Sequence, residues 1–288
     1  LHALAQKLAD LTGARFGYLG EAANSVGGYV AHAVPNASGL NAVRMLAESC
    51  RAYFVLHAEP ELDCANPQQA LAALKAADLV VALTPFKTRA VDYAHVILPI
   101  APFTETSGTF INTEGRVQSF NAVVKPLGET RPAWKVLRVL GNLLGLPGFE
   151  QESSEAVRAE VLGGKPASVA ERLNNQADGV ALNLAAPAPA LQRIADVPIH
   201  FADPLARRAP SLQKTRDAAP PAARMNAATL AKLGLAAGAQ VKVSLGGTAI
   251  LAAQLDAGVP DGCVRVAAGH ELTSGLGPMQ GELTVERA

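Results

Sequence analysis

The side chains most capable of chemistry gather in one stretch, residues 104 to 120, which reads "TETSGTFINTEGRVQSF". Two glycines there permit close backbone approach, Arg116 offers a forked donor for an anion, and the carboxylates and carboxamides suit a polar ring. The candidate ligand-binding residues are Glu105, Gly108, Thr109, Asn112, Glu114, Gly115, Arg116 and Gln118. Alternatively, these groups satisfy one another, and their spacing alone favours neither interpretation.

A second glycine-rich segment, "GEAANSVGGY", carries Gly20, Gly27 and Gly28. Such a segment can cradle a phosphate at the start of a helix, which would make it a nucleotide-binding loop. It matches neither the G-x-x-x-x-G-K-[ST] pattern nor the G-x-G-x-x-G pattern. Close backbone packing is therefore the favoured interpretation, and an independent nucleotide-binding module stays an alternative.

No other catalytic or metal-binding pattern is visible. The six histidines, at positions 2, 32, 57, 95, 200 and 270, never occur at metal-ligand spacing. Cys50, Cys64 and Cys263 form no C-x-x-C pair, which argues against a zinc ribbon, iron–sulfur ligation and a disulfide framework. The G-x-S-x-G elbow of serine hydrolases is absent. We therefore predict no catalytic residue and no metal ligand in this chain.

The composition limits the classes of partner. Basic and acidic residues balance at 25 each, so bulk charge favours neither nucleic acid nor an anionic membrane. No run reaches the ~18 apolar residues needed to cross a bilayer, and we expect no membrane insertion. The chain opens directly in a helical pattern, with Leu1, Leu4, Leu8 and Leu11 on one face and Gly13 closing it. We expect the chain to be a fragment of a larger protein from a reducing compartment.

The elements that must position the candidate loop follow an α/β pattern. Apolar strands "AYFVLH", "LVVALTP" and "AHVILPI" are separated by helical or turn segments, and "ARFGYLG" followed by "GLNAVRMLAES" extends the pattern toward the start. Continuous apolar strands with crossover helices predict a doubly wound, mostly parallel sheet. In such sheets ligands bind beyond the carboxyl ends of the strands, where the stretch 104 to 120 begins.

Helices are predicted after this loop. "RPAWKVLRVLGNLLG" repeats apolar residues at helical spacing and carries Pro132 in its first turn. "SSEAVRAEVLGG" ends at Gly163, and Ser168 with Glu171 fits a capping box at the start of "SVAERLN".

The last residues predict a different domain. A short helix, "NAATLAKLG", precedes the strands "AQVKVS", "TAILAAQL" and "CVRVAA", with a Gly246-Gly247 turn between the first two. We expect a small C-terminal β-barrel-like domain. The predicted division is an α/β domain over 1–180, an Ala/Pro-rich and basic linker over 181–221, and the barrel domain over 222–288.

Residues 191 to 225 carry more basic than acidic side chains. This is either a surface for an anion or acidic partner, or a solvated crossing between domains, and the second is favoured. The basic residues are Arg193, Arg207, Arg208, Lys214, Arg216 and Arg224.

Two segments carry a family resemblance. "ETSGTFINTEGRVQ" followed by "AWKVLRVLGNLLG" resembles the signature of the molybdopterin oxidoreductase superfamily, and "AATLAKLGLAAGAQVKVS" with "GVPDGCVRVAAGH" resembles its C-terminal barrel. The resemblance implies that the loop lies against a pterin cofactor and that the barrel helps to bind the cofactor's dinucleotide end.

A second, more specific family resemblance covers more of the chain. "GEAANSVGGYVAHAVP", "AEPELDCANPQQALAALKAAD", "PIAPFTETSGTFINTEGRVQSF" and "RRAPSLQKT" are similar to the family of iron–sulfur, electron-input subunits of bacterial NADH:quinone oxidoreductase, respiratory complex I. This implies a non-catalytic scaffold without a cofactor of its own, with iron–sulfur clusters upstream of this chain. It also implies peripheral-arm subunits as partners and a peripheral place on the cytoplasmic side of the bacterial inner membrane.

The two resemblances lead to different expectations for the loop. In the complex I branch, the eight candidate residues would hold one another. If Arg116 neutralised Glu105 or Glu114 inside a buried network, Arg116→Ala would destabilise the protein by roughly 3 to 5 kcal/mol. In the alternative, a genuine molybdopterin-dependent oxidoreductase whose metal ligand lies upstream, the same residues would face molybdopterin.

Overall fold

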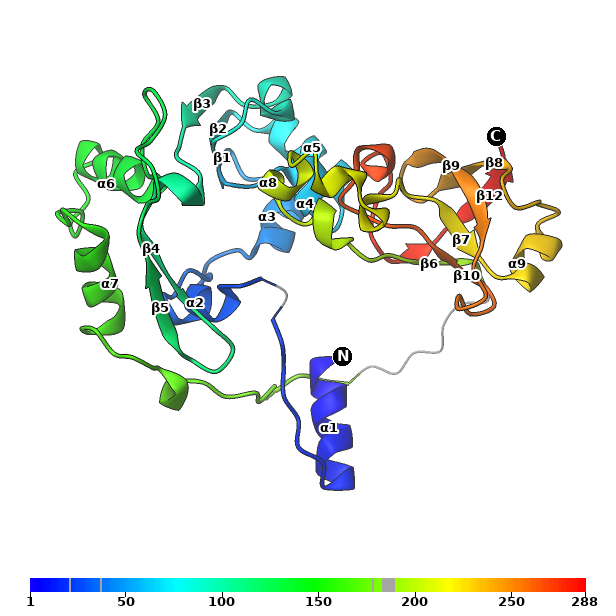
Figure 1. The fold of residues 1–288 in the computed structure, drawn as a ribbon, viewed down its shortest axis with the longest axis horizontal. Coiled ribbons are helices and arrows are strands. Elements are labelled where there is room, and N and C mark those ends of the chain that lie inside the picture. Colours follow the sequence, from blue (N-terminus) through cyan, green and yellow to red (C-terminus); the bar gives the residue numbers. More distant parts are fainter. Residues whose placement is uncertain (21, 37, 178, 183–189) are drawn as a thin grey trace. The chain divides into compact units, whose positions relative to one another are not determined.

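The computed structural model describes residues 1–20, 22–36, 38–177, 179–182 and 190–288 (Figure 1). They form two compact units, each made of two segments: unit 1 holds residues 1–41 and 99–186, and unit 2 holds residues 42–98 and 187–288. The Ala/Pro-rich part of the predicted linker lies mostly outside the described residues. No helix in the described ranges is long and apolar enough to cross a membrane.

Unit 2 contains the predicted parallel sheet. Its strands β1 (Ala52–Leu56), β2 (Leu79–Thr84) and β3 (Val96–Pro99) lie in the order β1-β2-β3, and β1 pairs in parallel with β2 from Ala52↔Leu79 to Leu56↔Leu83. The fold class and these three strands are thereby confirmed. β2 is buried along almost its whole length, as expected for a strand covered on both faces.

Short helices connect these strands. They are α3 (Ala42–Glu48), α4 (Pro60–Asp63), α5 (Pro67–Ala76) and the 3₁₀ turn η1 (Arg89–Asp92). α5 begins at Pro67, and the side chain of Asn66 caps its start by accepting a hydrogen bond from Gln69 N. Its buried residues Leu71 and Leu74 pack against Val80 of β2.

A nearly closed, barrel-like sheet of seven strands forms the rest of unit 2. The order is β11-β6-β10-β7-β9-β8-β12. The strands are β6 (Gln192–Ile194), β7 (Ala223–Met225), β8 (Gln240–Ser244), β9 (Thr248–Leu255), β10 (Cys263–Arg265), β11 (Gly281–Glu282) and β12 (Thr284–Arg287). β8 and β9 form the predicted antiparallel hairpin, and inward-facing Val241, Val243 and Leu251 fill the core. β6 comes from the stretch expected to be a linker.

Short helical elements precede and connect the barrel strands. They are η4 (Ile199–Phe201), α8 (Pro204–Arg207), η5 (Leu212–Lys214), η6 (Arg216–Ala218), α9 (Ala227–Lys232) and η7 (Glu271–Thr273). α9 is the predicted short helix, and its start is fixed by the Asn226 side chain, which accepts from Thr229 N. Residues 191–225 therefore form several short helical turns and strands.

Unit 1 is built around an antiparallel hairpin. Strands β4 (Gly108–Ile111) and β5 (Val117–Phe120) pair from Gly108↔Phe120 to Ile111↔Val117 (Figure 1). The other elements are α1 (His2–Thr12), α2 (Ser25–Val30), η2 (Phe103–Glu105), α6 (Ala133–Leu143), α7 (Ser154–Leu162) and η3 (Ala170–Arg172). A small core of Ile111, Leu162 and Val169, with Val26 and Val117 packed against it, joins the hairpin to α2 and α7.

Two predicted elements of unit 1 are wrong. "ARFGYLG" forms no strand, because residues 14–20 have no neighbouring strand to pair with; Phe16 and Tyr18 instead pack their rings on His2. "SVAERLN" forms only the single turn η3. Ser168 forms an antiparallel bridge with Arg116, just before β5, and Val169 N donates to the Gly115 carbonyl oxygen, so these residues are extended and not helical. The side chain of Ser168 accepts from Ala170 N, so it caps a turn and not a helix.

Candidate functional site

The predicted ligand loop, residues 104 to 120, forms the end of η2 and the whole β4–β5 hairpin with its turn. The Asn112 carboxamide oxygen accepts hydrogen bonds from Glu114 N at 3.1 Å and from Arg116 N at 2.9 Å, and Gly115 sits at the tip with a φ of 82°. A side chain that accepts from two backbone amides fixes the turn without help from a ligand. Asn112 is therefore a turn-forming residue.

The two glycines of the stretch pack against their own chain. A Cβ at Gly115 would stand 2.6 Å from the backbone nitrogen of Ala170, and a Cβ at Gly108 would stand 2.5 Å from the ring of Phe120. Both distances are shorter than real carbon contacts. The close approach that these glycines permit is thus to residues of this unit, which explains them without a ligand.

The outward-facing polar groups of the hairpin are less engaged. Glu114 and Arg116 are 73% and 67% exposed, and the nearest approach of their charged atoms is 3.6 Å. Gln118 is exposed, and its side chain forms no hydrogen bond with any residue that the structure describes. We call Glu114, Arg116 and Gln118 the hairpin edge. Arg116 does not lie in a buried charge network, so we no longer expect Arg116→Ala to lower the free energy of unfolding strongly.

The remaining candidate residues hold the hairpin and its neighbours. Thr109 and Ser119 hydroxyls lie 3.0 Å apart across the strands, and Arg158 of α7 donates to the same Ser119 hydroxyl. The Glu105 carboxylate accepts from Leu127 N at 2.9 Å and so fixes the loop that leads to α6. The eight predicted residues are thus divided between structural contacts and the exposed hairpin edge.

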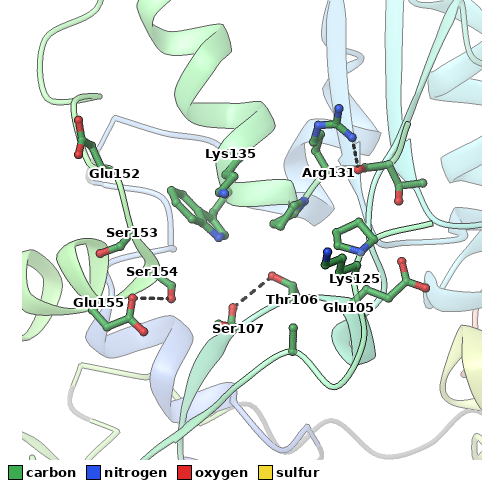
Figure 2. Close-up of a pocket in the computed structure, with 15 residues that line it drawn as sticks. Glu105, Thr106, Ser107, Lys125, Arg131, Lys135, Glu152, Ser153, Ser154 and Glu155 are labelled. Carbon is green, nitrogen blue, oxygen red and sulfur yellow. Dashed lines mark hydrogen bonds between the residues drawn. The ribbon is translucent and has the colours of Figure 1, made fainter. Parts of the chain in front are cut away.

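A pocket of about 540 Å³ opens where this stretch begins (Figure 2). Three segments of unit 1 line it: residues 105–107, the loop from 122 to the first turn of α6, and residues 152–155 at the start of α7. Its basic and aromatic lining consists of Lys125, Arg131, Trp134 and Lys135, none of which the sequence patterns single out as functional. The sequence feature that could have drawn attention to this pocket is Trp134, the single tryptophan of the sequence.

The segment Gly20 to Gly28 has a structural role. Asn24 accepts a hydrogen bond from Ile111 N at 2.8 Å, which ties the start of α2 to β4. Gly27 is buried, and a Cβ there would overlap the Asn24 side chain at 2.0 Å. This favours the packing interpretation over a phosphate loop.

The most buried charge cluster lies in unit 2 and was not predicted. The Glu59 side chain, 4% exposed, accepts from Arg207 Nη1 at 2.8 Å and also pairs with Arg208; Arg207 pairs in addition with Asp63. The guanidinium of Arg208 lies over the ring of Phe86, 4.4 Å from its centroid. We call Glu59, Asp63, Arg207 and Arg208 the α4–α8 cluster, because it joins the segment of α4 to that of α8.

Three further groups near α4 have shifted pKa values. Burial raises the pKa of the Glu61 carboxyl, and the nearby Glu59 adds to the increase. Tyr93 Oη lies 3.4 Å from Glu61, and burial likewise raises the pKa of the Tyr93 hydroxyl. Burial also raises the pKa of the Cys64 thiol to about 11, which leaves it protonated and a poor nucleophile at neutral pH.

Not all basic side chains of residues 191–225 are available to an acidic partner. Arg193 is buried and donates to the carbonyl oxygens of Val266, Gly277 and Pro278, and burial lowers its pKa to about 10. Arg207 and Arg208 belong to the α4–α8 cluster. Half of the six predicted basic residues are therefore committed inside unit 2.

Within the described ranges, no group of three or more His, Cys, Asp or Glu side chains is arranged to hold a metal ion. Burial lowers the pKa of His57 and of His270, and the His270 ring nitrogen accepts from Leu272 N as a cap of η7. All three cysteines are free thiols of intermediate exposure.

Comparison with known proteins gives relatives for part of the chain. An 84-residue segment is 39% identical to a protein of Staphylococcus aureus strain bovine RF122 / ET3-1 and 38% identical to one of strain USA300, both provisionally named formate dehydrogenases. The matched segments cover 29% of this chain and 8% of each relative. The chain thus matches a small part of much longer proteins.

A solved structure shares the fold over most of the chain. Acetylene hydratase from Pelobacter acetylenicus superposes with a TM-score of 0.57 at 20% sequence identity, covering 85% of this chain and 46% of that protein. Residues 1–143 match the family described as Molybdopterin oxidoreductase. The chain therefore carries a molybdopterin oxidoreductase family domain, matched over residues 1–143.

Proposed function

We propose that this chain is part of a molybdopterin-dependent oxidoreductase, and that the hairpin edge faces the cofactor. The family match over residues 1–143 and the relatives named as formate dehydrogenases support this function. They favour a genuine oxidoreductase over the complex I scaffold that the narrower resemblance implies. Formate is accordingly the first substrate to test.

The main support for this proposal is that the Arg116 side chain is exposed beside a turn whose backbone is fixed by hydrogen bonds. Asn112 and Gly115 fix the backbone, whereas among the described residues the guanidinium of Arg116 has only a 3.6 Å contact with an exposed carboxylate. The fixed backbone exposes the guanidinium of Arg116 and the carboxamide of Gln118. These two groups can bind a ligand that has phosphate oxygens and a polar heterocycle. The donor set of Arg116 and Gln118 therefore fits molybdopterin.

In this arrangement the cofactor supplies the redox chemistry, and the chain supplies orientation. Arg116 would bind an anionic group, Gln118 would donate to or accept from the ring system, and Glu114 would orient the Arg116 side chain. None of these three residues is assigned as a metal ligand.

The test separates binding from stability. Arg116→Ala should lower the pterin content of the purified full protein several-fold while changing the free energy of unfolding by less than about 0.5 kcal/mol, as for other exposed pairs. Arg51→Ala, which removes an arginine of an exposed pair in unit 2, is the matched control and should keep the wild-type pterin content. An unchanged pterin content in Arg116→Ala would remove the hairpin edge from the site.

A second candidate is the complex I scaffold, and one observation favours it. Gly108, Gly115 and Asn112 make their contacts within the chain, as expected of a cofactor loop retained for structure. In that case the partners would be peripheral-arm subunits at the cytoplasmic side of the bacterial inner membrane, and the clusters would lie upstream. Electron paramagnetic resonance signals of iron–sulfur clusters, together with NADH oxidation and no pterin, would select this candidate.

A further inference from the structure

The pocket of unit 1 combines three basic side chains with an aromatic ring and several hydroxyl groups. Lys125, Arg131 and Lys135 line it, from the loop before α6 and from the first turn of α6 (Figure 2). The Arg131 guanidinium donates to the Thr130 carbonyl oxygen at 2.8 Å and lies 3.7 Å from the exposed Glu129 carboxylate. Among the described residues, Lys125 has no hydrogen bond or ion pair, and Lys135 has only the Trp134 ring, 5.4 Å from its ammonium nitrogen. These two ammonium groups are available to a ligand.

Carboxylates also line the pocket, and two of the three are engaged. Glu105 accepts from Leu127 N at 2.9 Å, and Glu155 accepts from the Ser154 hydroxyl at 3.1 Å in the first turn of α7. Hydrogen bonding to its own backbone amide lowers the pKa of Glu155. Glu152 is exposed at the rim. The acidic groups are thus mostly held by local donors, whereas the lysines are not.

Neutral donors complete the lining. Ser107 offers a hydroxyl without a partner among the described residues, and the Thr106 hydroxyl donates to the carbonyl of Ser107 at 3.2 Å. The 11-residue helix α6 begins at the pocket without a side-chain cap, and within the described ranges the amides of Ala133 and Trp134 have no acceptor. Ammonium groups, hydroxyls and backbone amides are the donors that recognise phosphate oxygens.

We propose that this pocket binds a small phosphate-bearing molecule, in addition to the cofactor role of the hairpin edge. Lys125, Arg131 and Lys135 bind the phosphate oxygens, Ser107 donates a hydrogen bond, and Trp134 contacts the organic part of an ester. The hairpin edge shares no residue with the pocket, so the two proposals can fail independently.

Trp134 provides the measurement, because it is the single tryptophan of the 288 residues and lines the pocket. The protein is titrated with inorganic phosphate, pyrophosphate and phenyl phosphate at constant ionic strength, and binding is followed by tryptophan fluorescence and by calorimetry. We expect saturable binding. Tighter binding of phenyl phosphate than of phosphate would identify an ester as the ligand, and equal binding would identify free phosphate or pyrophosphate.

Variants locate the site. Arg131→Ala and Lys125→Ala should each raise the dissociation constant by about three- to tenfold, the range expected for one charge-assisted contact at a partly exposed site. Lys232→Ala on α9 is the matched control and should bind like the wild type. Trp134→Phe should lose the fluorescence change and keep the calorimetric signal.

Two results would overturn the proposal. One is the absence of saturable binding by either method up to about 20 mM of all three probes, far above the range of specific ligand sites. The other is binding that the Arg131→Ala, Lys125→Ala and Lys232→Ala variants weaken equally, since that would indicate a general charge effect.

Discussion

Loss of the Glu59 carboxylate should destabilise unit 2 strongly. Glu59 is 4% exposed and is the shared acceptor of Arg207 and Arg208, so Glu59→Ala leaves two guanidinium groups without the carboxylate that they share. Removing one partner of a buried ion pair typically costs about 3–5 kcal/mol. Arg207 keeps Asp63, and Arg208 is 36% exposed to water, which places the expected loss near the lower end, about 3 kcal/mol.

The magnitude is checked by urea denaturation. Hydrogen exchange of the buried β2 amides assigns the transition to unit 2, while Trp134 fluorescence follows unit 1 and should not change. Arg51→Ala is the control, because Arg51 and Asp78 approach to 2.8 Å but are 92% and 64% exposed. That exposed pair should contribute less than about 0.5 kcal/mol.

A double-mutant cycle isolates the pair. Glu59→Ala, Arg207→Ala and the double variant should show a coupling free energy of about 1.5–3 kcal/mol, as for neighbours in one network. A stabilising role for the buried pair is refuted if Glu59→Ala costs no more than Arg51→Ala, or if the coupling is within about 0.5 kcal/mol of zero.

Two further predictions concern stability. Burial raises the folded-state pKa of Glu61, so the folded protein holds this proton more tightly than the unfolded chain; the free energy of unfolding should therefore fall as pH rises from about 4.3 through the folded pKa. Glu61→Gln should flatten this part of the pH profile of unit 2, and an unchanged profile would contradict the assignment. Gly115→Ala should cost about 1–3 kcal/mol because of its φ of 82° and its contact with Ala170, whereas Gly28→Ala, with open space around it, should not destabilise. Equal effects of the two substitutions in thermal unfolding would show that the packing at Gly115 is unimportant.

Local signals in the sequence predict the elements that they directly determine. Asn66 and Pro67 start α5, Gly13 closes α1 in the left-handed conformation, and the Gly246-Gly247 turn joins β8 to β9. Each signal acts through hydrogen bonds or backbone angles within a few residues, so no knowledge of the tertiary structure is needed.

The parts that depend on distant residues could not be predicted. Glu59 and Arg207 are 148 residues apart, and no periodic pattern links them. The residues around Phe16 satisfy a strand pattern, but a strand also needs a partner edge, which the sequence does not reveal. Gly108 fits the pattern of a ligand loop, yet the space beside it belongs to Phe120.

The candidate site shows the same division. The stretch 104 to 120 follows β3 along the chain, and its exposed edge at Arg116 includes predicted residues. The pocket depends on three segments spread from residue 105 to residue 155, and most of its polar side chains lie outside the stretch 104 to 120. Only their convergence in space makes them a candidate site.

We propose that this chain belongs to a protein that holds molybdopterin, and the cofactor content of the purified protein tests this proposal most directly. The protein is purified from its natural source, its molybdenum and tungsten are measured by mass spectrometry, and pterin is measured by the fluorescence of its oxidised derivative. We expect metal and extractable pterin in a fixed, stoichiometric ratio to protein. Iron–sulfur clusters with neither metal nor pterin would contradict the claim and support the complex I scaffold.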